Sequence, residues 1–386
     1  MSKADIKHSD RAHAVLSASS SHRWINCPAS IKMEEGYPET TSDVALEGTA
    51  AHELAEFKLR KLFKRRPGKR PQSDLETIEM DEMTDDYRDY VSDIIEDLGG
   101  LKAVLPYVEV RVDFSAYAPG GFGTADCVII GDDVLNIIDL KYGKGLLVVA
   151  ENNPQLKLYA LGVLDMLDYP DEIKTVRLHI FQPRRENFDH WDISVEDLKA
   201  WGEWVKPIAN EAYNGSDKQC TGEWCTFCKA QAKCRAHAVD MLHIVDVSNE
   251  KSPTELSDEE IDELLPKLED CQKWAKAVMA YAQEQALTGK KWTTFKLVQA
   301  RSNRKYADEV KVVEALNKAG YTDVFKKTLL GVGDMEKLLG KKEFNTILTE
   351  SGLIIKPEGS PTLVSRADRR DEIEINGLYG FTEEGD

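Results

Sequence analysis

The chain has 386 residues and a formal net charge of −18. This length allows one large domain or two ordinary ones with a sizeable core, and the negative charge argues against a protein that coats nucleic acid through a basic surface. A nuclease is not excluded, because an acidic site can hold divalent cations while DNA is contacted through one basic patch. The basic run at 58–70 is the best local candidate for that patch, with a solvated helix end as the alternative.

The chain carries no sign of export or membrane insertion. No apolar run reaches the roughly 20 residues that a membrane helix needs, and the N-terminal stretch MSKADIKHSDRAHAV lacks an apolar signal core. We therefore expect a cytoplasmic protein. Its seven cysteines then favour reduced thiols, metal ligands or cluster ligands over a disulfide framework.

The first part of the chain alternates between helical and strand patterns. The expected elements are a helix over 42–63, strands over 107–114, 122–130 and 134–141, a helix from 153 to 166, and a strand over 174–181. Gly131-Asp132-Asp133 predicts a tight hairpin between the second and third strands. This order of elements predicts an α/β fold with a mixed sheet.

The strand over 107–114 alternates strictly between apolar and polar residues. Val108, Val110 and Val112 are expected on one face, with Glu109 and Arg111 on the other. Glu109 is a candidate acid for a site on the polar face, and an ion pair with Arg111 is the alternative.

The third strand ends in a pair of charged residues. Because residues two apart share a face of a strand, Asp139 and Lys141 project together, and the hairpin brings Asp126 alongside them. Paired carboxylates hold Mg²⁺ or Mn²⁺, which would lower the pKa of a bound water while the lysine orients the nucleophile or stabilises charge. The alternative for an isolated D-x-K is a surface ion pair.

Four short motifs occur in the order that one nuclease group shows. GTAD at 123–126 resembles its G-x-x-D motif, DLK at 139–141 its D/E-x-K motif, QLKLY at 155–159 its Q-x-x-x-Y motif, and EGTAAH at 47–52 its histidine-bearing helix. Over about residues 15–240 the chain therefore resembles the RecB-like branch of the PD-(D/E)XK nuclease superfamily.

The resemblance implies a restriction-endonuclease-like mixed-sheet core flanked by helices. The catalytic residues that it implies are Asp126, Asp139, Lys141, Gln155 and Tyr159. The implied metal ligands are His52, Asp126, Asp139 and the backbone oxygen of Leu140, with Glu109 as a further candidate, and the histidine favours Mn²⁺ beside Mg²⁺. The alternatives are a solvent-facing helix histidine for His52 and ordinary helix packing for Gln155 and Tyr159.

Three closely spaced cysteines form the pattern C-x₂-C-x₅-C at Cys225, Cys228 and Cys234. Two chemistries fit this spacing. One is a Zn²⁺ site with His237 as the fourth ligand, and the other is an iron–sulfur cluster whose fourth thiolate comes from the distant Cys27.

The stretch LSASSSHRWINCP at 16–28 resembles the start of the iron–sulfur nucleases of this branch, which include AddB-type and CRISPR-associated enzymes. That resemblance implies a 4Fe–4S cluster held by Cys27, Cys225, Cys228 and Cys234, and favours the cluster over Zn²⁺. Cys220 leaves the local ligand set open, because it forms C-x₄-C-x₂-C with Cys225 and Cys228.

The C-terminal part is expected to be mostly helical. A helix over 257–288 has apolar residues at spacings of three and four, which predicts packing against another helix or self-association; these residues are Ile261, Leu264, Leu268, Cys271, Ala275, Val278 and Ala282. We predict a nuclease domain with its iron–sulfur staple over 1–245 and an α-rich extension over 246–386. The whole chain is similar to a class of phage-encoded RecB-like proteins that carry such an extension.

These features together predict a metal-dependent deoxyribonuclease, an exonuclease acting in phage or bacterial DNA recombination, repair or replication. Its partners would be DNA and phage recombination or replication proteins, in the bacterial host cytoplasm if the chain is phage-encoded. The alternative is a catalytically weak DNA- or partner-binding subunit of a recombination complex.

Overall fold

A computed structural model describes residues 14–37, 43–167, 170–246 and 257–296, and further along positions 335, 339–340, 344–350 and 353. Contacts divide the chain into Met1–Thr288 and Gly289–Asp386. The boundary predicted between 245 and 246 differs from this division, because α8 (Asp258–Leu287) contacts α7 (Arg235–Asp246) within the first unit. In the second unit, the described residues include a short π-helix at Asn345–Thr349.

A mixed five-stranded sheet forms the centre of the first unit. Its strands are β1 (Leu105–Asp113), β2 (Phe122–Ile130), β3 (Val134–Leu140), β4 (Thr175–Gln182) and β5 (Asn187–Ser194). They lie in the order β1-β2-β3-β4-β5, and every neighbouring pair is antiparallel except β3 and β4, which run parallel. The predicted α/β fold with a mixed sheet is therefore confirmed.

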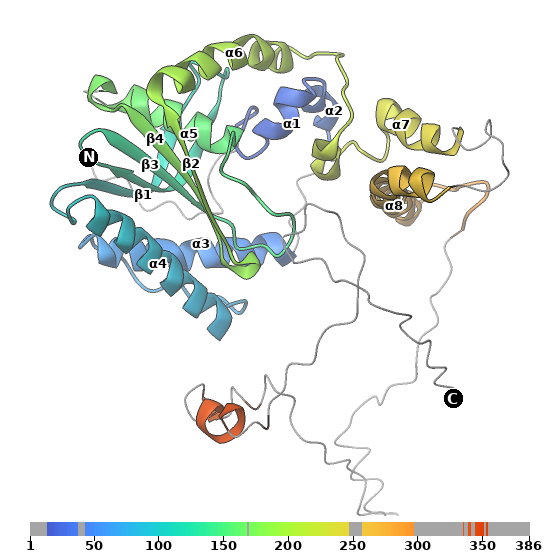
Figure 1. Ribbon diagram of the computed structural model, residues 1–386. Coiled ribbons are helices and arrows are strands. Elements are labelled where there is room, and N and C mark those ends of the chain that lie inside the picture. Colours follow the sequence, from blue (N-terminus) through green and yellow to red (C-terminus); the bar gives the residue numbers. More distant parts are fainter. Residues whose placement is uncertain are drawn as a thin grey trace, which may run out of the picture. The chain divides into compact units, whose positions relative to one another are not determined.

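Helices cover both faces of this sheet (Figure 1). One face carries α3 (Asp43–Leu62) and α4 (Ile78–Asp97), which pack on a core that includes Leu59, Tyr87 and Ile138. The other carries α5 (Pro154–Met166) and α6 (Val195–Tyr213) over a larger core. The short helices α1 (Ser21–Asn26) and α2 (Ser30–Glu34) contact α6. None of the described helices could span a membrane.

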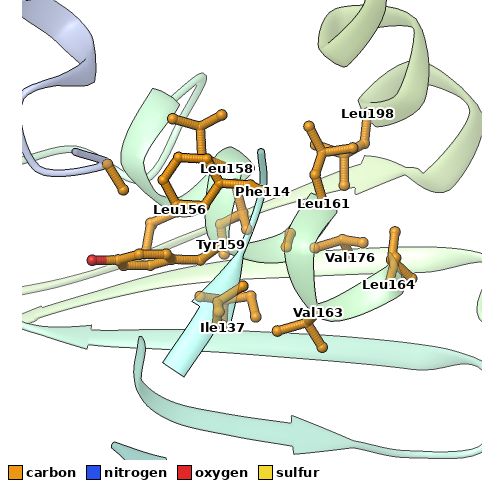
Figure 2. Packing of buried hydrophobic residues seen from close by; sticks show 14 of the residues in the cluster. Phe114, Ile137, Leu156, Leu158, Tyr159, Leu161, Val163, Leu164, Val176 and Leu198 are labelled. Atoms are coloured by element: carbon orange, nitrogen blue, oxygen red, sulfur yellow. The ribbon is translucent and has the colours of Figure 1, made fainter. Parts of the chain in front are cut away.

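Helix α5 packs very closely on the sheet. Asn153 caps its first turn by accepting a hydrogen bond from the Leu156 N–H at 3.2 Å. A Cβ on Gly162 would come within 2.4 Å of a Val112 methyl group, so only glycine fits where α5 meets β1. Figure 2 shows α5 side chains such as Leu161 and Leu164 in this core together with Val176 and Leu198.

The face prediction for the first strand is wrong at one residue. Val112 belongs to the core under α5, but Val108 belongs to the core under α3 and α4. The alternation changes phase at Glu109, whose φ of 49° lies in the left-handed region that strand residues avoid. The partner strand changes phase opposite it, since Ala125 faces one core and Cys127 the other. This double irregularity lies where Glu109 and Asp126 face each other.

Part of the basic run at 58–70 is engaged by α4. Lys58 is buried, and its ammonium group lies 2.9 Å from Asp81 and 3.1 Å from Asp85 of α4. Arg70 also pairs with Asp81, at 2.8 Å. These two charges are neutralised by α4, whereas the other exposed basic residues of the run, from Lys61 to Lys69, still face solvent.

Candidate metal and phosphodiester site

Three side chains with metal-binding atoms converge at the irregular point of the sheet. His52 comes from α3, Glu109 from β1 and Asp126 from β2, and one donor atom from each lies within 4.8 Å of the others. His52 Nδ1 lies 3.4 Å from Asp126 Oδ1, and these two side chains are 21% and 13% exposed, so solvent reaches the group. The resemblance singled out His52 and Asp126 as ligands, and it left Glu109 as a further candidate.

A second group lies at the end of β3. Lys141 Nζ is 2.9 Å from Asp139 Oδ2 and donates to Gln155 Oε1 at 3.0 Å. Gln155 Nε2 donates in turn to Asp139 Oδ1 at 2.8 Å. The three side chains form a closed ring, so Asp139 and Lys141 do project together as the strand period predicts, and Gln155 from α5 fixes their geometry.

The backbone of β3 joins the two groups. The Leu140 N–H donates to Asp126 Oδ2 at 2.8 Å, which holds that carboxylate beside the Asp139 group. The resemblance implies the Leu140 carbonyl oxygen as a metal ligand, and the contact seen here is made by the N–H of the same residue. Asp126 is thus oriented by His52 on one oxygen and by β3 on the other.

His52 and Asp126 shift each other's pKa. Burial favours the neutral form of His52, but the Asp126 carboxylate outweighs it and raises the pKa of His52 to about 9. Burial also opposes the charge of Asp126, yet His52 and the Leu140 N–H lower the pKa of this carboxyl below its usual value. An imidazolium and a carboxylate therefore pair here, and a metal would have to displace the His52 proton.

In the second group, the pKa of the carboxyl group shifts in the other direction, upward. Burial, and then the nearby Asp126 charge, raise the pKa of Asp139, although Lys141 partly offsets them. Burial would lower the pKa of Lys141, but the Asp139 carboxylate outweighs it and raises it. Lys141 is therefore a fixed positive charge at neutral pH and not a proton acceptor.

Tyr159 lies deeper than the other predicted site residues. It is 6% exposed and belongs to the core under α5, where its hydroxyl oxygen lies at the edge of the cluster in Figure 2. Burial raises the pKa of Tyr159 well above its usual value, so the hydroxyl stays protonated. Its ring packs on Gly123, the first residue of the GTAD motif.

Sequence reasoning missed a buried arginine beside this site. Arg184, in a 3₁₀ turn at Pro183–Arg185, binds Glu47 Oε2 at 2.9 Å and Glu79 Oε2 at 3.4 Å. Its guanidinium lies 4.8 Å from the ring centre of Tyr142, the residue after Lys141. No periodicity marks such a residue, because its partners lie on helices more than 100 positions away.

Five of the seven cysteines lie in a second region, near α1: Cys27, Cys220, Cys225, Cys228 and Cys234. Burial raises the pKa of the Cys27 thiol, and the nearby Cys220 and Cys234 add to this effect; burial likewise raises the pKa of Cys225, with smaller contributions from Cys27 and Cys234. Cys228 lies beside Cys225, Glu34 and Arg23, and burial raises the pKa of Cys228 to about 12. All seven cysteines are free thiols. Cys27 thus lies close enough to Cys220, Cys225 and Cys234 for their thiols to interact electrostatically, and the ligand set of Cys27, Cys225, Cys228 and Cys234 stays a prediction.

Polar contacts hold together the two segments that bear Cys27 and Cys225. Arg23 donates to the Phe227 carbonyl oxygen at 3.0 Å and to Glu34 Oε2 at 2.7 Å. Glu34 Oε1 accepts from the Lys229 N–H at 2.8 Å. This network fixes the segment that bears Cys27 against the 3₁₀ turn at Glu223–Phe227.

The two donor sets suit different metals. Histidine nitrogen with carboxylate oxygens fits a divalent cation such as Mn²⁺ or Mg²⁺. Thiols that burial keeps protonated, gathered from both ends of the domain, fit a Zn²⁺ ion or an iron–sulfur cluster, either of which would deprotonate them.

Comparison with known proteins gives one family match. The model of a family described as "Protein of unknown function (DUF2800)" matches residues 13–371. Among solved structures, the chain is similar to one titled "Crystal structure of SSO0001", at 11% sequence identity and a TM-score of 0.30, with 59% of this chain and 89% of that chain covered. A likeness at this TM-score assigns neither fold nor function.

Proposed function

We propose that this chain, which belongs to the DUF2800 family, is a metal-dependent nuclease that hydrolyses phosphodiester bonds in DNA. One observation carries the proposal: a histidine and carboxylates from separate elements meet beside a lysine that Asp139 and Gln155 hold in place. This combination of metal ligands and a fixed cation suits metal-assisted phosphodiester hydrolysis. The resemblance to RecB-like nucleases agrees with it.

The metal would lie at His52, Glu109 and Asp126, whose donor atoms already converge. When bound, a divalent cation there would polarise the phosphodiester and lower the pKa of a water molecule. The histidine nitrogen favours Mn²⁺ beside Mg²⁺. Asp139 lies within electrostatic reach of Asp126 and completes the acidic surroundings of the cation.

Lys141 would supply positive charge where the phosphate gains negative charge. Its ammonium group keeps its proton, because the Asp139 carboxylate raises its pKa. Asp139 and Gln155 hold it in one orientation, so little reorganisation is needed as the reaction proceeds. Lys141 therefore stabilises the transition state and orients the attacking water, but does not take up a proton.

The second metal centre would be structural. We propose that Cys27, Cys225, Cys228 and Cys234 hold a 4Fe–4S cluster, with Zn²⁺ as the alternative, which fastens the N-terminal segment to the end of the domain. The proximity of Cys27 to Cys225 and Cys234 supports this assignment. The proposed role is that of an exonuclease in phage or bacterial DNA recombination, repair or replication.

The test is a cleavage assay on end-labelled single- and double-stranded DNA with Mn²⁺, Mg²⁺ or EDTA. We expect metal-dependent cleavage that Asp139→Asn and Lys141→Ala each reduce by about 100-fold or more. Lys174→Ala is the matched control, since this exposed lysine precedes β4 at the end of the sheet away from Lys141. If Lys141→Ala cleaves as fast as Lys174→Ala, the assignment of the active site is wrong.

Metal binding is measured separately, by the spin-resonance signal of Mn²⁺. We expect Glu109→Gln and Asp126→Asn to weaken Mn²⁺ binding, whereas Lys174→Ala leaves it unchanged. A parent protein that binds Mn²⁺ and DNA but releases no cleavage product would indicate a binding role for the same site.

A further inference from the structure

The loop between β3 and α5 is held by one buried amide side chain. Gln182, at the end of β4, is 2% exposed. Its Oε1 accepts from the Val148 N–H at 3.1 Å, and its Nε2 donates to the carbonyl oxygens of Gly143 at 3.2 Å and Leu146 at 3.0 Å. With a further bond from Asn187 at 3.3 Å, all four hydrogen-bonding positions of the amide are used.

Two neighbouring residues fix the rest of the loop. Asn187 is fully buried and donates to the Val148 carbonyl oxygen at 2.7 Å, while Asp189 accepts from the Ala150 N–H at 2.9 Å. Side chains of β4 and β5 thus provide the hydrogen bonds that a loop lacks when it has no sheet partner. Residues 143–150 are therefore preorganised.

This loop lies beside the candidate site at both of its ends. It begins directly after Lys141 and leads through the Asn153 cap to Gln155, which binds Lys141. Near its middle, Leu146 is 54% exposed and Val149 is 48% exposed. A fixed backbone therefore presents two aliphatic side chains to solvent in the segment that joins Lys141 to Gln155.

The surrounding charges favour contacts to bases over contacts to phosphates. Two basic residues near this loop lie beside carboxylates: Arg184 beside Glu47 and Glu79, and Lys144, within the loop, 3.8 Å from Glu79. Attraction for phosphates, in a duplex and in a single strand alike, is reduced accordingly. An unpaired strand exposes the apolar faces of its bases, which a duplex keeps within its stack.

We propose that loop 143–150 is a preformed contact surface for the unpaired bases of a single-stranded nucleic acid, with Leu146 and Val149 as the contacting side chains and Gln182 as the positioning residue. The inference rests on the proposed nuclease function and extends it to the form of the substrate. On this proposal, the protein prefers single-stranded over double-stranded substrate because of this loop.

The experiment measures fluorescence anisotropy of a labelled 20-nucleotide single strand and of the duplex of equal length, both with Ca²⁺ and checked by gel for integrity. We expect the double variant Leu146→Ser/Val149→Ser to bind the single strand about tenfold more weakly than the parent, and the duplex no more weakly. Val239→Ser is the matched control, because Val239 is a 62% exposed residue of α7.

Gln182→Leu tests the positioning role through a second readout. We expect faster hydrogen exchange at the Val148 and Ala150 amides, together with the same loss of single-strand affinity. Equal exchange rates in parent and variant would overturn this role. The thermal melting curve shows that the variant is folded when both measurements are made.

The outcomes separate this inference from the proposed function. If the double variant binds the single strand as tightly as Val239→Ser, or loses single-strand and duplex affinity equally, the inference is wrong although cleavage may persist. A protein that cleaves nothing but loses single-strand affinity in the double variant supports the loop and contradicts the nuclease. A parent that binds no DNA overturns both.

Discussion

The ring of Tyr159 lies directly on the Cα of Gly123: a Cβ built on this glycine would come within 2.7 Å of Tyr159 Cε1. These two residues are 36 positions apart in the chain and belong to the GTAD and QLKLY motifs. One turn earlier in α5, Gln155 binds Asp139 and Lys141 at the end of β3, the strand next to β2. Two short motifs are thus connected by packing as well as by chemistry.

Gly123→Ala should therefore displace Tyr159 and move α5. We expect a loss of about 1–3 kcal/mol in the free energy of unfolding, because the added methyl group has no room. Urea denaturation measures it. Gly145→Ala is the matched control, since a Cβ there meets nothing within 4 Å. If both substitutions cost the same, the close packing of Tyr159 on Gly123 does not constrain α5.

The strands near the site could be predicted because their patterns agree with simple geometry. A hairpin signal at Gly131 and apolar runs on either side placed Asp126 next to Asp139, and the period of two put Lys141 on the same face. The Gly131 N–H indeed donates to the Val134 carbonyl oxygen at 2.9 Å across this hairpin.

Other features depend on contacts that no local pattern contains. Strict alternation through 107–114 gives no sign that Glu109 adopts a positive φ, which tertiary contacts impose. Strand β5 was not predicted, since residues such as Asp189, His190 and Asp192 give it few apolar positions. The ion pairs of Lys58 could not be recognised without knowing that α4 lies against it.

Arg184 is expected to contribute more to stability than an exposed arginine. Its side chain is 10% exposed, and Arg184→Met would leave Glu47 and Glu79 without their shared partner. We expect a loss on the order of 2–3 kcal/mol in the free energy of unfolding.

Arg177→Met is the control for this experiment, because Arg177 and Asp192 pair at 2.7 Å with both side chains more than 40% exposed. This variant should cost about 0–1 kcal/mol in urea denaturation. Comparable losses for the two arginines would mean that burial of Arg184 adds nothing to its ion pairs.

His179 should make the protein less stable in mild acid. It is buried between Tyr90, whose hydroxyl lies 2.8 Å from Nδ1, and Asn136, whose Oδ1 lies 3.1 Å from Nε2. Burial, assisted by His190 and Arg177, lowers the pKa of His179 from 6.5 to about 3. Between these pH values His179 is protonated in the unfolded chain but neutral in the folded protein. The free energy of unfolding is therefore highest above pH 6.5 and falls as the pH drops towards 3.

Urea denaturation of the parent and of His179→Gln at pH 7 and pH 5 measures this effect. We expect the stability advantage of the parent over the variant to shrink by about 2 kcal/mol between the two pH values. His243→Gln, at an exposed position of α7, should show no such change. An advantage that is the same at both pH values would contradict a neutral, buried His179.

The cysteine cluster gives a prediction about metal content. In protein purified without oxygen, we expect about four irons per chain and a brown colour. Cys27→Ser, Cys225→Ser, Cys228→Ser and Cys234→Ser should each lose most of the iron, whereas Cys271→Ser, on the half-buried surface of α8, should retain it.

Cys220→Ser decides between the two local ligand sets. Cys220 lies next to Cys27, whereas Cys228 lies beside the carboxylate of Glu34, which disfavours a thiolate. We nevertheless expect Cys228 to be the ligand, because the C-x₂-C spacing brings Cys225 and Cys228 together in one turn, and metal binding supplies the free energy to deprotonate its thiol. Loss of iron in Cys220→Ser with retention in Cys228→Ser would show that Cys220, and not Cys228, is the ligand. Stoichiometric zinc without iron would show that the site holds Zn²⁺ in place of the cluster.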